Sequence, residues 1–232
     1  MSQCHMHCYH KACIHITAYC FNKYISFAFL ENFQIWLYIF FSGCNAKTDL
    51  VFALDSSGSV GRENFQKLLN FVISIIEEMN IQSEGTRVGL MTFSSRAYIS
   101  FPMNKYEHLD QVKRAILTTP YRYGDTYTAD ALQLLREYFF TEFRGAREDV
   151  PDYAIMITDG VSNLRNGRTI PEAHRVQDEG IHIFSIGIGL TNLEEIYAIS
   201  SEPSSANTFL VKDFDELSKV GPDLVSAICG GL

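Results

Sequence analysis

From residue 49 onward, the sequence alternates between short apolar runs and longer amphipathic segments. The runs suit strands buried on both faces, and the longer segments carry apolar residues at helical spacing, as at Phe65, Leu68 and Val72. We expect strands at 49–54, 87–93, 97–101, 152–158, 181–188 and 208–211. We expect helices at 63–80, 106–117, 128–140, 169–180, from 191 onward and at 213–229, the last interrupted by Gly221-Pro222. This alternation predicts an α/β fold: a doubly wound, mostly parallel sheet with helices on both faces.

Three predicted helix starts carry a residue pattern typical of an N-terminal cap. Thr169 and Thr191 are each followed three residues later by a glutamate, which is the pattern of a capping box. Asp213 stands in the same relation to Glu216. We therefore expect these side chains to bond the free backbone N–H groups of the first turn.

Polar side chains follow the predicted strands and precede one predicted helix. Asp55, Ser57 and Ser59 follow the first strand, Thr126 precedes the helix at 128, and Asp159 follows the strand at 152–158. In a doubly wound sheet, ligands bind beyond the carboxyl ends of the strands. Carboxylate and hydroxyl oxygens without His or Cys suit a hard cation such as Mg²⁺ or Ca²⁺ and disfavour Zn²⁺. Each piece alone is also an ordinary turn or helix cap, so only the combination predicts a metal site.

The combination resembles the von Willebrand factor type A domain and its metal-ion-dependent adhesion site. The family's D-x-S-x-S lies in DLVFALDSSGSV, its threonine in TYTADAL and its distal aspartate in DYAIMITDG. One departure is Ala129, where the family often has glycine. The resemblance covers roughly residues 48–229 and is strongest to the A domains of matrilins (cartilage matrix protein) and collagens.

The resemblance implies a metal-dependent binding mechanism. Ser57, Ser59 and Thr126 would hold a divalent cation directly, and Asp55 and Asp159 would act largely through water. The cation would be Mg²⁺, with Mn²⁺ or Ca²⁺ as alternatives, and an open coordination position would accept a carboxylate from a partner.

The resemblance also implies the setting of the protein. It implies a secreted adhesion module of the extracellular matrix, without enzymatic activity, that binds collagen or another matrix protein through an acidic residue. Self-association stays open, and the mature domain needs no membrane. Arg122, Arg165 and Arg168 either line the rim of the site and receive the acidic partner or are solvated loop charges.

Charge and missing motifs narrow the alternatives. The net charge is −8, from 19 Lys and Arg against 27 Asp and Glu, which argues against nucleic acid or an anionic membrane as the main partner. A Mg²⁺-dependent hydrolase is a weaker alternative, because Ser57 stands where a D-x-D enzyme has its second carboxylate, and no P-loop or G-x-S-x-G is present. A second alternative is an intracellular A domain that serves as a protein-assembly platform.

Cys44 and Cys229 bracket a long segment without any other cysteine. They are either two unrelated thiols or a disulfide that ties the two ends of one domain together. A disulfide would indicate an oxidising compartment and favour the secreted interpretation.

The first 43 residues differ from the rest of the chain. Cysteines and histidines crowd the beginning without a zinc-finger spacing, and Phe33–Phe41 is about as long as the apolar region of a signal peptide. We therefore expect residues 1–43 to be an atypical leader or a non-native extension, with a membrane anchor as the alternative. The A domain is expected to span residues 44–232.

Overall fold

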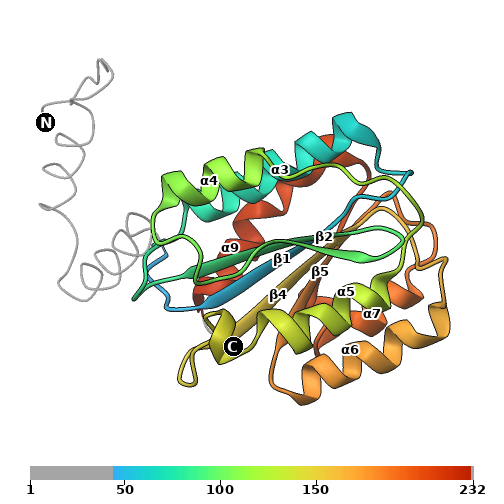
Figure 1. Ribbon diagram of the computed structural model, residues 1–232. Helices are drawn as coiled ribbons and strands as arrows, with labels where there is room; N and C mark the ends of the chain where they lie inside the picture. The colour runs from blue at the N-terminus through green and yellow to red at the C-terminus, as the bar shows by residue number, and fades with distance from the viewer. Residues whose placement is uncertain (1–43, 231–232) are drawn as a thin grey trace, which may run out of the picture. The chain divides into compact units, whose positions relative to one another are not determined.

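The computed structural model describes residues 44–230, so the predicted leader at 1–43 lies outside the described residues. The described part contains one six-stranded sheet with the order β3-β2-β1-β4-β5-β6 (Figure 1). The β2–β3 pair is antiparallel, and all other neighbours are parallel. The strands are β1 (Asp49–Asp55), β2 (Arg87–Phe93), β3 (Ala97–Phe101), β4 (Asp152–Thr158), β5 (His182–Ile188) and β6 (Thr208–Val211).

Helices cover both faces of the sheet, as the sequence predicts. One face carries α3 (Gly61–Glu77), α4 (Leu109–Leu117) and α9 (Gly221–Gly230), and the other carries α5 (Thr128–Leu134), α6 (Thr169–Asp178) and α7 (Glu194–Ile199). A short helix, α8 (Ser204–Asn207), precedes β6. Every residue of β1 is buried, with Leu50, Phe52 and Leu54 facing the first layer and Val51 and Ala53 facing the second. Full burial on both faces is what an apolar run in a central parallel strand requires.

Helix ends differ from the expected bounds by a few residues. The helix expected at 63–80 runs from Gly61 to Glu77, and the one expected at 106–117 starts at Leu109. The helix expected at 128–140 is α-helical only to Leu134 and then continues as a short π-helix over Leu135–Phe139. The expected break at Gly221-Pro222 is confirmed, because a 3₁₀ segment ends at Lys219 and α9 starts at Gly221.

Both predicted capping boxes are wrong. Thr169 lies inside its helix and its buried hydroxyl has no hydrogen-bond partner among residues 44–230, while Glu172 accepts from Arg136 and Arg175 instead. Before α7, the Asn192 side chain, not that of Thr191, accepts a bond from the Glu194 N–H at 3.0 Å. Ion pairing of the buried Glu172 carboxylate with Arg136 outweighs a cap bond, which is worth about 1 kcal/mol.

The Asp213 cap is confirmed, although it opens a different element. Its carboxylate accepts the Asp215 N–H at 3.0 Å and begins the 3₁₀ segment Phe214–Lys219. The Glu216 side chain accepts from the Lys212 N–H at 3.2 Å, so the acid three residues on also serves the start of the segment.

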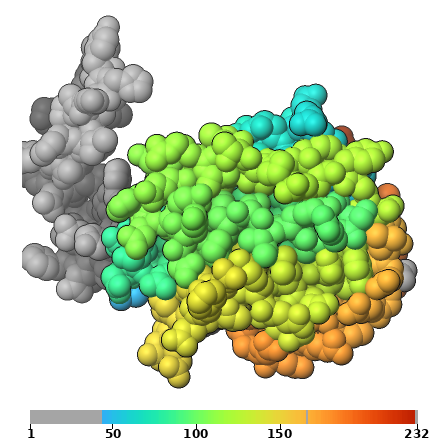
Figure 2. Space-filling model, in the orientation of Figure 1, coloured from blue at the N-terminus to red at the C-terminus, as the bar shows by residue number. Residues whose placement is uncertain are grey.

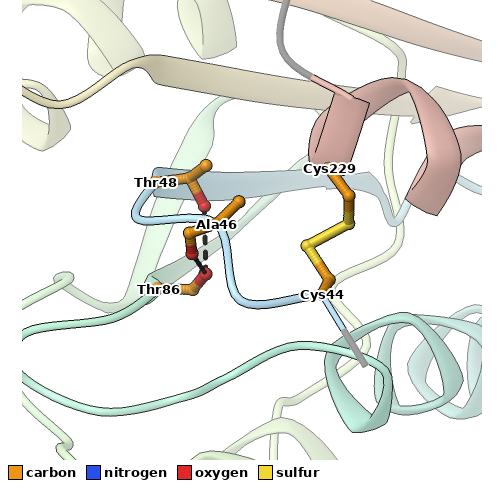
Figure 3. The surroundings of a disulfide bond; sticks show 5 residues. All are labelled: Cys44, Ala46, Thr48, Thr86 and Cys229. Atoms are coloured by element: carbon orange, nitrogen blue, oxygen red, sulfur yellow. Dashed lines mark hydrogen bonds between the residues drawn. A yellow bond between two sulfur atoms is a disulfide. The ribbon is translucent and has the colours of Figure 1, made fainter. Parts of the chain in front are cut away.

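A disulfide joins Cys44 to Cys229 (Figure 3). Cys44 is also held by backbone bonds, donating to Glu78 O at 2.9 Å and accepting from Asn80 N at 3.0 Å. The bond therefore ties the end of α9 to the segment that enters β1 and to the end of α3.

We expect loss of this disulfide to destabilise the domain without changing its fold. The bond closes a loop with a sequence separation of 185 residues, so the unfolded chain gains much freedom when it is removed. The double variant Cys44→Ser/Cys229→Ser should lose about 2–5 kcal/mol of unfolding free energy in urea denaturation. An unchanged midpoint and slope would contradict a stabilising role.

A charged cluster lies at the amino end of the sheet, opposite the loops that follow the strands. Asp49 is fully buried and accepts the backbone N–H of Arg147 at 2.7 Å and its Nε–H at 2.9 Å. Asp152 stands beside Asp49 on the neighbouring strand, and its buried Oδ1 has no partner in the described chain. Burial and the adjacent Asp49 carboxylate raise the pKa of Asp152 to about 7.

This cluster predicts a pH dependence of stability. A carboxyl whose pKa rises on folding binds its proton more tightly in the folded state, so its contribution is complete below pH 4 and is lost as the pH rises to about 7. Asp152→Asn should remove this loss and be about 1–2 kcal/mol more stable than the wild type at pH 8. Thermal melts between pH 4 and 8 test this, with the exposed Asp149→Asn as control. Equal pH profiles for the wild type and Asp152→Asn would refute the assignment.

Candidate metal centre

Oxygen-bearing side chains meet where β1 and β4 end. The two strands are parallel neighbours, so the loops after Asp55 and Thr158 lie side by side. The Ser59 hydroxyl donates to Asp159 Oδ1 at 2.8 Å, and the Ser57 and Ser59 hydroxyl oxygens are 3.0 Å apart. Ser57 is buried, whereas Ser59 is exposed, so the cluster opens to solvent on the Ser59 side.

The Asp55 carboxylate forms the buried base of this cluster. One oxygen accepts the Ser57 N–H at 2.8 Å, and the other accepts the Thr158 hydroxyl at 2.7 Å. Burial raises the pKa of Asp55 to about 6, although both hydrogen bonds act to lower it. Because both oxygens are engaged, Asp55 braces the loop that carries the two serines.

The loop that carries Thr126 is held next to the Asp159 loop by hydrogen bonds of the Thr126 backbone. Its N–H donates to the Asn163 side chain at 2.9 Å, and its carbonyl accepts the Asn163 N–H at 3.0 Å. Asn163 follows Asp159 in the same loop, so the Thr126 loop and the Asp159 loop are bound together. The Thr126 hydroxyl makes no hydrogen bond to any residue in 44–230, and a direct link between this side chain and the other four is therefore not formed.

The 121–124 segment clamps the serine loop. The Tyr121 hydroxyl donates to Ser57 O at 2.7 Å, and the Gly58 N–H donates to Gly124 O at 2.8 Å. A Cβ at Gly58 would lie 3.2 Å from the Tyr123 ring, so glycine permits this close approach. The tight turn at Gly58 brings Ser57 and Ser59 to the same side.

The Asp159 loop has a further support from α7. The Glu195 carboxylate accepts the Ser162 N–H at 2.7 Å, and burial raises the pKa of this glutamate. Sequence reasoning missed Glu195, Asn163 and Tyr121, because each acts through a contact with a residue far away in the chain. Thr158 had a local signal, since it directly precedes Asp159 in the T-D-G motif.

The donor set fits a divalent cation. Adjacent ligands of an octahedral ion with oxygen distances near 2.1 Å are about 3.0 Å apart. The 3.0 Å between the Ser57 and Ser59 oxygens and the 2.8 Å between Ser59 and Asp159 are close to this edge length. Within residues 44–230, no three His, Cys, Asp or Glu side chains gather into a group, so any such site depends on its hydroxyls.

The three candidate rim arginines occupy different environments. Arg168 donates to the Tyr127 hydroxyl at 3.0 Å, beside Thr126 in the chain. The Arg122 guanidinium lies over the Tyr98 ring of β3, with Cζ 4.6 Å from the ring centroid. Arg165 is exposed and has a positive φ of 46°. None of the three pairs with an acid among the described residues.

Comparison with known protein families shows which family the chain belongs to. The family model of the von Willebrand factor type A domain matches residues 49–222. The chain belongs to this family. Its curated relatives include Matrilin-4 of Mus musculus (36% identity over 184 residues, 78% of this chain and 29% of the relative) and Matrilin-1 of Gallus gallus (32% over 187 residues, 81% and 37%). Collagen alpha-4(VI) chain of Mus musculus is 31% identical over 183 residues, 78% of this chain and 8% of the relative.

The A-domain chain therefore spans less than two fifths of the length of these relatives. These relatives, the matrilins and collagen VI, are secreted proteins of the extracellular matrix, the setting that the resemblance implied. Among residues 44–230, none of the helices is both long and apolar enough to cross a bilayer.

Solved structures show the same fold. Proximal thread matrix protein 1 from the mussel byssus has a TM-score of 0.76 at 26% identity, over 80% of this chain and 49% of that chain. A second structure of that protein, with a TM-score of 0.75 and 26% identity over the same shares, has a zinc-occupied MIDAS motif, the metal-ion-dependent adhesion site. The manganese-loaded TRAP protein of Plasmodium vivax shares the fold, with a TM-score of 0.61 and 22% identity over 78% of this chain and 74% of that chain.

The zinc-occupied relative bears on the expectation that oxygen ligands disfavour Zn²⁺. An all-oxygen donor set was expected to disfavour zinc, yet the MIDAS motif of that relative holds it. In that relative, the occupying ion therefore does not follow the preference expected from oxygen ligands.

We expect Mg²⁺ to stabilise the wild-type protein by mass action. At 100 times the dissociation constant, the gain is about 2.7 kcal/mol, which corresponds to roughly 5–10 °C in Tm for a domain of this size. Ser59→Ala and Asp159→Ala should lose this shift in differential scanning fluorimetry. Asp125→Ala, which removes an exposed acid from the Thr126 loop, should keep it. A full Mg²⁺ shift in Asp159→Ala would show that the ion binds elsewhere.

Proposed function

We propose that the chain is a non-enzymatic adhesion module that binds matrix proteins through a divalent cation held by Asp55, Ser57, Ser59, Thr126 and Asp159. The observation that carries this proposal is that the Ser59 hydroxyl lies 3.0 Å from the Ser57 hydroxyl and 2.8 Å from Asp159 Oδ1, next to the buried Asp55. We propose Mg²⁺ as the ion, with Mn²⁺ or Ca²⁺ as alternatives.

A bound cation would supply a positive charge with one open position for a carboxylate. The residues of the A domain prepare that chemistry. Ser57 and Ser59 offer neutral hydroxyls, which leave most of the positive charge uncompensated. Asp55 keeps the serine loop in place through the Ser57 N–H, and its own charge is buried and shared with Thr158. Asp159, from the opposite loop, would balance part of that charge.

The partner we propose is an extracellular protein that presents a glutamate or aspartate. Collagen and other matrix proteins fit this description, and so does a second copy of the chain. The match to matrilins and collagen VI supports a matrix partner. We further propose that residues 44–232 form the functional domain and that residues 1–43 are a leader outside it.

Enzymatic and intracellular functions have less support. The side chains that converge after β1 and β4 are hydroxyls and carboxylates, with no histidine or cysteine among the five candidate ligands. Such a set offers a place for an ion, and Ser57 stands where a D-x-D enzyme has its second carboxylate. The Cys44–Cys229 disulfide favours an oxidising compartment over the cytosolic assembly-platform alternative.

Binding should depend on the cation and on the ligating hydroxyls. We expect the wild-type chain to bind one or more proteins in an immobilised panel of collagens and matrix proteins in the presence of Mg²⁺. EDTA, Ser59→Ala or Thr126→Ala should each weaken this binding at least tenfold, while Asp125→Ala should bind as the wild type does. Surface plasmon resonance provides the measurement, and phosphatase and ATPase assays with Mg²⁺ should show no turnover. Binding of equal strength in EDTA would contradict the proposal.

A further inference from the structure

An aromatic and basic patch lies beside the candidate metal centre. It consists of Arg96, Tyr98 and Arg122, and we call it the β3 patch. The Arg96 and Arg122 Cζ atoms lie 4.8 and 4.6 Å from the centroid of the Tyr98 ring. Each guanidinium is less than 5 Å from the same ring centre, so the two charges lie within about 10 Å of each other.

Neither guanidinium of the β3 patch is neutralised. Both arginines are exposed, and in the described chain neither forms an ion pair or a side-chain hydrogen bond. Two acids are near these residues in the chain, Asp125 in the Thr126 loop and Asp130 in the first turn of α5. Asp130 is occupied by the Ala97 N–H, and Asp125 is exposed. Because neither guanidinium forms a side-chain hydrogen bond in the described chain, the N–H groups of both remain available for a carboxylate.

The β3 patch is built on the loops of the metal centre. Arg122 directly follows Tyr121, whose hydroxyl holds Ser57 O at 2.7 Å. Arg96 closes a turn in which its carbonyl accepts the Ser94 N–H at 3.0 Å, and Ser94 O accepts the Tyr127 N–H at 2.9 Å, next to Thr126. The patch is therefore connected to two of the three loops that carry the candidate ligands.

The β3 patch is accessible from solvent. β3 is an edge strand, and Figure 2 shows the hairpin in green, exposed between α4 above and α5 below. A groove of about 220 Å³ runs between β3 and the end of α4, with Arg122, Ile99, Thr118 and Pro120 among its lining residues. A short extended segment of a partner that leaves the metal centre in this direction would meet Arg122.

We propose that the β3 patch is a second anchor for the acidic partner and binds a second carboxylate of the same segment. This rests on the proposed function, since the first carboxylate is the one received at the cation. The partner is thus a polypeptide segment with two acidic residues, one for the cation and one for Arg96 and Arg122. A protein segment fits better than a sulfated polysaccharide, because the chain carries a net charge of −8 and the patch has only two cations.

The test uses the full chain and synthetic peptides as probes. One series carries a single glutamate, and a second carries two glutamates separated by one to six Gly or Ser residues. Titrations to millimolar peptide, with ¹⁵N-detected NMR of backbone amides and of the arginine Nε groups, measure weak affinities and report where each peptide binds. All titrations are run with Mg²⁺ and with EDTA.

We expect at least one spacing of the two-glutamate series to bind about fivefold more tightly than the single-glutamate peptide in Mg²⁺. The gain should shift the Nε signals of Arg96 and Arg122 and disappear in Arg96→Gln/Arg122→Gln. It should persist in Arg114→Gln, which removes an exposed arginine of α4, and shrink in Arg96→Lys/Arg122→Lys, which keeps the charge without the planar fork.

The outcomes separate the second anchor from the proposed function. Mg²⁺-dependent binding of single-glutamate peptides without any gain from a second glutamate would overturn the second anchor and leave the proposed function intact. Peptide binding that is unchanged by EDTA would overturn both. The second anchor also fails if no peptide binds. It fails likewise if heparin binds at 150 mM salt, this binding is lost in Arg96→Gln/Arg122→Gln, and no peptide binds.

Discussion

The buried carboxylate of Asp55 links the two central strands at the end where the candidate ligands gather. It accepts the Ser57 N–H from its own loop and the Thr158 hydroxyl from the end of β4, at 2.8 and 2.7 Å. Burial of an acid in a core is costly unless its oxygens are bonded, and here both are. The positions of Ser57 and Ser59 follow from this brace, and Ser59 in turn contacts Asp159 at 2.8 Å. The cluster is thus preorganised by the protein itself.

The two ends of the sheet have different roles. At the amino end, Arg147 neutralises Asp49, and the Cys44–Cys229 bond ties the last helix to the start of β1. These interactions are buried or covalent and hold the domain together. At the carboxyl end, the Ser59 hydroxyl faces solvent, and so do Arg96 and Arg122, which form no ion pair in the described chain. The stability of the domain and its binding surface therefore depend on different sets of residues.

Much of the fold could be predicted from the sequence because its signals are local. The apolar runs at 87–93, 97–101, 152–158 and 208–211 match strands β2, β3, β4 and β6 to the residue. The predicted capping boxes failed because long-range contacts intervened: Glu172 is drawn into an ion pair with Arg136, 36 residues away. A local pattern cannot show such a competitor.

In the candidate site, too, the sequence indicates what is local and misses what depends on long-range contacts. Its five proposed ligands lie in short motifs, so the sequence alone indicates them. Their supports, Tyr121, Asn163 and Glu195, act across the fold and only the structure reveals them. The β3 patch joins Tyr98 on an edge strand to Arg122 on a distant loop, and spacing alone would not have suggested that contact. The MIDAS motif of a relative holds zinc, which the oxygen ligands alone would not have suggested.

The central claim is that one divalent cation sits between the Ser57 and Ser59 hydroxyls. Crystals of the protein grown with Mn²⁺, measured at a wavelength where manganese scatters anomalously, test it most directly. The account predicts one strong anomalous peak about 2.1–2.2 Å from both serine oxygens, with the Asp55 carboxylate still bonded to Thr158. A featureless map at this place, or a peak bound by other residues alone, would contradict it.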